Sequence, residues 1–341
     1  MHNRMSDPVL PALDAADLNT RSNSSNRLLR ARAYPLLVVA SLMLSLLVSD
    51  QVWGRTPHLP IAEAQVPGVA TKAREGSTKA PDVAALLQEV NPPEGHQLSV
   101  SYGDLGPRLL QSGAIDYDQF AAVYATAGNP LTQAQINILR QGSSESIVIT
   151  PENAHFLLNF FWAVGLVNEN SILTQGPLAQ YAQGRIDGFA STGGWTLGSK
   201  PVTELFASMR LIELTPGQQD RVEEVASAVY RPCCDNPTLF PDCNHGMAML
   251  GLLELMASQD ASVDDMWTAA KYVNAYWFPA EAIETAIYLR ANKDVDFSHA
   301  NPRMVTGRQL SSGSGFGLLH AELESKGLLP QSPDNGGSCR T

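Results

Sequence analysis

From residue 81 onward, apolar residues recur at helical spacing in segments that end at capping residues, glycine or proline. Thr132 with Gln135 has the spacing of a capping box, and so has Thr215 with Gln218. The segment 151–165 is apolar almost all round, which indicates a central helix. The pattern predicts helices at 84–90, 116–128, 132–142, 151–165, 215–230, 245–258, 263–276, 279–291 and 316–326, with a brief strand at 147–149.

These segments predict an all-α, mostly helical globular domain over 81–330, because strand signals are too few for a sandwich or a doubly wound sheet. A glycine-rich, irregular stretch falls near 176–200 and marks a possible division into two subdomains. Residues 331–341 are polar and irregular, so we expect a flexible tail there.

The N-terminal part of the chain has a different pattern. Residues 1–32 are polar and basic and predict a disordered tail, 33–53 form an apolar signal anchor or transmembrane helix, and 54–80 form a flexible linker rich in proline and alanine. Arginines precede the apolar run, so the positive-inside rule places the helical domain outside the cytoplasm. The alternative is a cleaved signal peptide that leaves a secreted or periplasmic protein, with Ala62-Glu63-Ala64 resembling a cleavage site.

The charge balance narrows the range of partners. The chain has 23 basic and 34 acidic residues, a net charge of −11. Residues 1–32 hold five arginines and three aspartates, so the remainder has 18 basic and 31 acidic residues, a net charge of −13. Such a surface repels phosphate backbones, and we expect no nucleic-acid partner. The expected partner is the membrane, through the N-terminal helix, and the sequence leaves open whether a protein or a small molecule also binds.

The candidate chemistry lies in one proline-stiffened segment, Arg231-Pro-Cys-Cys-Asp-Asn-Pro-Thr-Leu-Phe-Pro-Asp-Cys-Asn-His245. It contains three of the four cysteines and one of the seven histidines. Asn244 is the expected N-cap of the following helix, whose free N–H groups favour a thiolate at Cys243. Cysteine sulfur and histidine nitrogen are the donors that soft transition metals prefer.

We therefore predict a metal site made by Cys233, Cys234, Cys243 and His245, with Met249 as a weak axial ligand. The donor set favours copper, with zinc or iron as alternatives. Two more distant residues are candidates for its second shell. Glu254 lies among leucines and methionines in the middle of an apolar helix, and His155 lies in the first turn of the 151–165 helix.

Two other interpretations of the segment stay open. Cys233 or Cys234 can form a disulfide with Cys243, which gives a stapled, non-enzymatic scaffold or partner-binding module. Alternatively, Cys243 attacks and one of the other two cysteines resolves, as in a thiol–disulfide oxidoreductase. The sequence has no CxxC, CxxCH, GxSxG or HExxH motif, so it leaves open whether the protein is an enzyme.

Overall fold

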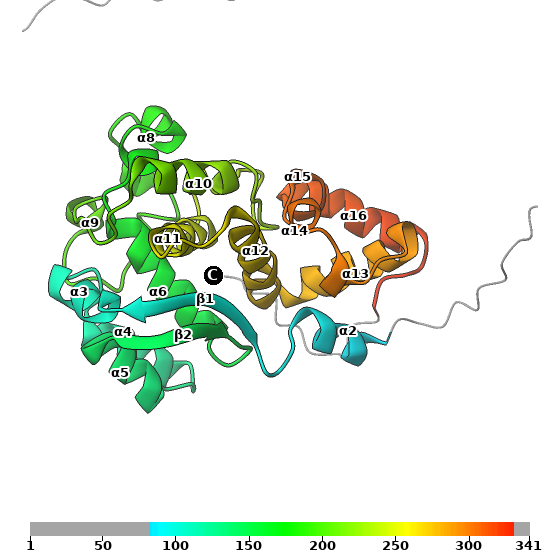
Figure 1. The fold of residues 1–341 in the computed structure, drawn as a ribbon, viewed down its shortest axis with the longest axis horizontal. Coiled ribbons are helices and arrows are strands. Elements are labelled where there is room, and N and C mark those ends of the chain that lie inside the picture. The colour runs from blue at the N-terminus through cyan, green and yellow to red at the C-terminus, as the bar shows by residue number, and fades with distance from the viewer. Residues whose placement is uncertain (1–81, 331–341) are drawn as a thin grey trace, which may run out of the picture. The chain divides into compact units, whose positions relative to one another are not determined.

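The computed structural model of the chain describes residues 82–330, of which 59% are helical and 7% lie in strands. The prediction of a mostly helical domain is confirmed for this part of the chain (Figure 1). The predicted N-terminal tail, the anchor at 33–53, the linker at 54–80 and the C-terminal tail all lie outside the described residues. Within 82–330, no helix combines the length and apolar character that crossing a membrane requires.

Each predicted helix is present, with ends that differ by a few residues. The elements in chain order are α2 (Val83–Val90), β1 (His96–Gly103), α3 (Leu105–Ser112), α4 (Tyr117–Thr126), α5 (Gln133–Gln141), β2 (Ser143–Ile149), α6 (Ala154–Val167), α7 (Ser171–Thr174), α8 (Pro177–Ala182), η1 (Ile186–Gly188), α9 (Val202–Leu205), α10 (Pro216–Ala226), α11 (Asn244–Ser258), α12 (Val263–Trp277), α13 (Pro279–Lys293), η2 (Phe297–His299), α14 (Pro302–Val305), α15 (Arg308–Ser311) and α16 (Gly313–Ser325). Both predicted capping boxes are formed.

The strand content differs from the prediction. The strand expected at 147–149 is the end of a longer strand, β2, which pairs antiparallel with β1 in a two-stranded sheet. The strand β1 was not predicted, although Leu98, Val100 and Tyr102 alternate along it and are all buried. This period of two is the signal that would have identified the strand.

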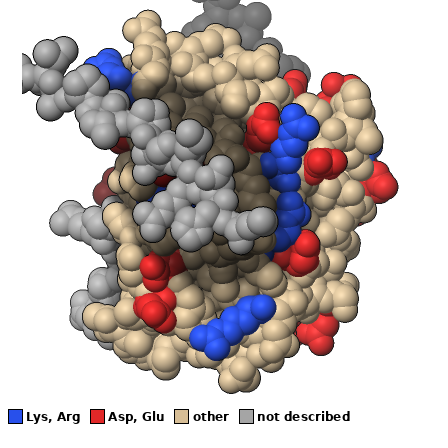
Figure 2. Space-filling model, turned by 90° about the vertical axis from the view of Figure 1, so that its left-hand side faces the viewer, with Lys and Arg blue, Asp and Glu red and all other residues tan. Residues whose placement is uncertain are grey.

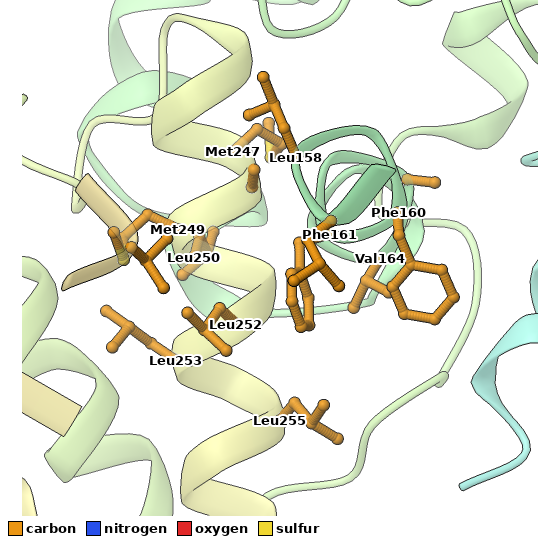
Figure 3. Packing of buried hydrophobic residues seen from close by; sticks show 14 of the residues in the cluster. Leu158, Phe160, Phe161, Val164, Met247, Met249, Leu250, Leu252, Leu253 and Leu255 are labelled. Atoms are coloured by element: carbon orange, nitrogen blue, oxygen red, sulfur yellow. The ribbon is translucent and has the colours of Figure 1, made fainter. Parts of the chain in front are cut away.

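The helices α6 and α11 cross in the half of the domain that contains the hairpin, between α10 and β1 (Figure 1). Their backbones approach closely where two glycines face each other, since a Cβ atom on Gly251 would lie 2.5 Å from the Phe161 carbonyl oxygen and 2.6 Å from the Gly165 nitrogen. Figure 3 shows the side chains around this crossing, with Phe161 of α6 on the side of Leu252 of α11 and Val164 beside Phe160. Both helices are buried over most of their length, which confirms that 151–165 belongs to a central helix.

The core consists of two clusters of buried apolar side chains. The larger includes residues of the hairpin, α6, α10, α11 and α12, so residues on both sides of the 176–200 stretch share it. The smaller joins α2 to α13 and α16, near the two ends of the described chain. The helix α12 borders both clusters, with Trp277 in the larger one and Ala275 in the smaller one.

The surface has mixed charge on the side that Figure 2 shows. Acidic and basic side chains stand near one another on the part of this face that the grey atoms leave visible. The absence of a nucleic-acid partner stays a prediction from the net charge.

Candidate metal site

The cysteine-containing segment forms a closed loop between α10 and α11. At its middle, Thr238 donates a backbone N–H bond of 2.9 Å to the Val229 carbonyl. At its beginning, the first turn of α16 holds it, because the Gly313 N–H donates to the Cys234 carbonyl at 2.8 Å and the Ser314 N–H donates to Asp235 Oδ1 at 2.7 Å. These anchors and the three loop prolines fix the backbone that carries the three cysteines.

Cys243, and not Asn244, is the N-cap of α11. Its backbone is extended, and its Sγ accepts a hydrogen bond from the Gly246 N–H at 3.4 Å. The prediction that Asn244 caps this helix is wrong by one residue. The correction brings the sulfur closer to the helix N-terminus than expected, where free N–H groups and the helix dipole stabilise a thiolate.

A buried arginine joins the two ends of the loop. Arg231 is 1% exposed, and its Nε donates to Cys243 Sγ at 3.1 Å. Its Nη1 donates to the Asn236 carbonyl at 2.8 Å, and its Nη2 donates to Asp242 Oδ1 at 2.6 Å. The guanidinium therefore holds both the sulfur and the loop around it.

Arg231 and Asp242 were missed as functional residues by the sequence analysis, although both lie in the segment that it singled out. A basic and an acidic residue placed at the two ends of a cysteine-containing loop were the available signal. That signal does not reveal burial, which is what makes the pair a fixed part of the site.

Three possible ligand atoms converge beside this arginine. Cys233 Sγ lies 3.5 Å from Cys243 Sγ and 4.0 Å from His245 Nδ1, and the three atoms all lie within 4.8 Å of one another. The described cysteines are not disulfide-bonded, and a distance of 3.5 Å is far longer than the ~2.05 Å of an S–S bond. The Cys/His group is therefore near enough to hold one metal ion.

The two sulfurs differ in their electrostatic environment. Hydrogen bonds from the Cys233 and Cys234 thiols hold the pKa of Cys243 well below its usual value against the effect of burial, and the Arg231 guanidinium and His245 act in the same direction. Hydrogen bonds to Cys234 and Cys243 raise the pKa of Cys233. The surroundings therefore favour ionisation of Cys243 over ionisation of Cys233.

A second group of possible ligands consists of Cys234, Asp242 and Cys243. Its carboxylate is already occupied, because Asp242 Oδ1 accepts from Arg231 and Oδ2 accepts from Asn236 Nδ2 at 2.7 Å. A cation at this position would displace a buried guanidinium from its counter-ion, which is strongly unfavourable. The group of Cys233, Cys243 and His245 is therefore the better candidate.

Aromatic rings form one wall of this candidate site. The His245 ring lies 4.4 Å from the Phe278 ring and 5.8 Å from the Trp277 ring, measured between centroids. Phe278 and Trp277 come from the junction of α12 and α13, so two parts of the chain that are distant in sequence meet here. Such apolar walls limit the access of water to a bound ion.

Three other predicted site residues lie outside this group of ligand atoms, two on α11 and one on α6. Met249 is 1% exposed and lies in the larger core cluster, on α11 beside Leu250 (Figure 3). Glu254 follows His245 by nine residues on the same helix, which is about 13.5 Å along its axis. It is fully buried beside Asn168 and Asn170, so it belongs to a different polar group. His155 is exposed and packs on Tyr124 at 5.2 Å.

Comparison with known proteins provides no relative for this chain, since no family model, no curated protein and no solved structure matches it. What the described part of the chain establishes is a class: a mostly helical domain with a Cys/His group near enough to hold a metal ion. The function is argued from that group.

Proposed function

We propose that this chain is an exported, membrane-anchored protein that binds a soft transition metal, with Cu(I) as the preferred ion. One observation carries the proposal: two unbonded cysteine sulfurs and an imidazole nitrogen, drawn from two ends of a rigid loop, lie within 4.8 Å of one another. The ligands are Cys233, Cys243 and His245. Cys234 is an additional ligand proposed from the sequence, whereas Met249, also predicted as a ligand, lies in the larger core cluster.

The donor set favours Cu(I) because thiolates and imidazole are soft or intermediate ligands, and three of them are enough for that ion. A zinc ion prefers four ligands in a tetrahedron and would need Cys234 or a water molecule as the fourth. Iron is the third candidate. Arg231 offsets the negative charge that two thiolates would give to a complex with a monovalent ion.

Metal analysis of the full-length chain tests the proposal. We expect one equivalent of Cu(I) after anaerobic loading and removal of free metal, and a loss of binding in the Cys243→Ser and His245→Ala variants. A His320→Ala variant is the matched control, since His320 is on α16 and pairs with Glu284 at 2.8 Å. Substoichiometric metal in the wild type, or full binding in the Cys243→Ser variant, would refute the proposal.

The membrane anchor is proposed from the sequence of 33–53 and has its own test. We expect the full chain in the membrane fraction after an alkaline carbonate wash, and a chain without 33–53 in the soluble fraction. An intact full-length chain in the soluble fraction would refute the anchor, and a shortened mature chain there would indicate a cleaved signal peptide.

A disulfide-stapled module is the second candidate function, because the 3.5 Å between Cys233 Sγ and Cys243 Sγ requires only a small movement for bonding. Counting free thiols in the protein as isolated distinguishes the two. Metal binding needs both sulfurs reduced, whereas the staple needs them joined. A thiol–disulfide oxidoreductase would cycle between the two states.

A further inference from the structure

The two cysteine ligands of the proposed site are held very differently. Cys243 Sγ accepts from the Arg231 Nε–H at 3.1 Å and from the Gly246 N–H at 3.4 Å, and it caps a 15-residue helix. Cys233 is exposed. Its Sγ lies near Cys243 Sγ and His245 Nδ1, which are the other two proposed ligand atoms. One sulfur is therefore fixed by the protein and the other is reachable from solvent.

This difference decides which metal–sulfur bond is easier to replace. If Cys243 left the ion, its thiolate would stay next to Arg231 and could rebind at once. If Cys233 left, its side chain could turn into solvent while Cys243 and His245 kept the ion. An incoming ligand therefore competes most effectively with Cys233.

We infer that the site passes its Cu(I) to a thiol-bearing acceptor by a ligand exchange that begins at Cys233, an inference that rests on the proposed function. In the first step, the acceptor thiol gives a new Cu–S bond, the Cu–S bond to Cys233 breaks, and the proton of the acceptor thiol moves to the Cys233 sulfur. The copper stays Cu(I) throughout, so no oxidant or reductant is needed. A second acceptor thiol then forms a Cu–S bond as the bonds to His245 and Cys243 break, and its proton moves to the Cys243 sulfur.

The chemistry of the acceptor follows from the site. A ligand that replaces a cysteine on Cu(I) must itself be soft, and a thiol is the matching group in a protein partner. The chain has a net charge of −11, so an acceptor without excess negative charge around its thiol approaches more readily. N-acetylcysteine amide, a small neutral thiol, serves as the probe.

The test follows the order in which the cysteines become free. The Cu(I)-loaded full chain is mixed anaerobically with N-acetylcysteine amide, pulsed with N-ethylmaleimide at increasing times, and analysed by peptide mass spectrometry, with bound copper measured in parallel. We expect Cys233 to be labelled about tenfold faster than Cys243, the ratio that one charge-assisted hydrogen bond confers. The rate should rise in proportion to the thiol concentration.

An Arg231→Lys variant makes the test specific. It removes the guanidinium that fixes Cys243, so the two cysteines should be labelled at similar rates when the variant is loaded at a copper concentration high enough to fill its weakened site. Labelling of Cys243 first in the wild type, or a release rate independent of thiol concentration, would overturn the exchange mechanism alone. Absence of copper after loading would instead refute the proposed function, and this inference with it.

Discussion

A Cβ atom on Gly246 would lie 2.5 Å from Nη2 and 2.6 Å from Cζ of Arg231. The guanidinium thus lies directly against the first turn of α11, in space that any side chain at position 246 would occupy. Because Nε of the same guanidinium donates to Cys243 Sγ, the glycine is what allows the positive charge to reach the sulfur. The geometry of the site therefore depends on a residue without a side chain.

We predict that Gly246→Ala destabilises the fold by about 1–3 kcal/mol, the usual cost of overpacking a buried position. It should also weaken Cu(I) binding, because Arg231 must move away from Cys243. Urea denaturation and copper competition measure the two effects. Gly217→Ala, near the start of α10, is the matched control, since a Cβ atom there has no neighbour within 4 Å. Equal stability of the two variants would contradict the packing argument.

Arg231→Lys should lower the affinity for Cu(I) by about 10–100-fold, the range typical of groups that support a metal ligand. Lysine keeps the charge, but its single ammonium group cannot reach Cys243 Sγ, the Asn236 carbonyl and Asp242 Oδ1 together, as the planar fork of arginine does. Arg231→Met should be worse, with a loss of about 3–5 kcal/mol in folding stability, because it leaves the Asp242 carboxylate without its counter-ion.

Equilibrium copper competition and urea denaturation check both changes. Arg185→Lys is the control, since Arg185 is exposed on the loop after α8. If Arg231→Lys bound copper as tightly as the wild type, the guanidinium would serve only the fold of the loop.

Nine helices were predictable from the sequence because their signals are local, whereas α3, α7, α8, α9, α14 and α15 were not predicted. The capping boxes at Thr132 and Thr215 and the apolar run of α6 each lie within one segment, and each predicted element formed. The loop that contains Cys233 and Cys243 was also identifiable, since its cysteines are clustered in the sequence.

The remainder of the site depends on tertiary structure. Arg231 belongs to the site only because Gly246 of α11 leaves room for its guanidinium and because the loop buries it. Phe278 reaches His245 from a helix junction more than thirty residues later. The separation of Glu254 from the site follows from the helical rise, but its place beside Asn168 depends on the packing of α11 against the end of α6.

Bound copper should protect two cysteines of the loop and leave the third reactive. We predict that iodoacetamide modifies Cys233, Cys234 and Cys243 in the metal-free chain, but mainly Cys234 in the Cu(I)-loaded chain. Asp242 and Arg231 already occupy the space on the Cys234 side of Cys243, so the copper ion should not reach the Cys234 sulfur. Peptide mass spectrometry measures each site separately. Protection of Cys234 as well would support the larger ligand set that the sequence predicts.

The buried carboxyl group of Glu254 should make the stability of the domain depend on pH. Glu254 is fully buried, and neither carboxyl oxygen has a hydrogen bond of ordinary geometry. Burial raises its pKa from the ordinary 4.5 to about 8, although the neighbouring Asn168 and Asn170 amides act in the opposite direction. Below pH 4.5 both the folded and the unfolded state are protonated, so the group has no effect there.

Between pH 4.5 and 8 the unfolded state loses this proton while the folded state keeps it, so the folded state loses about 1.4 kcal/mol of stability for each pH unit. We predict that Glu254→Gln removes this slope, since an amide cannot ionise. The variant should be more stable than the wild type at pH 8, with a difference that shrinks toward pH 5. Urea denaturation at pH 5, 6, 7 and 8 provides the measurement, with Glu324→Gln on the exposed face of α16 as the control. If the stability of the wild type and of Glu254→Gln changed with pH in parallel, Glu254 would have a charged neighbour or contact water in solution.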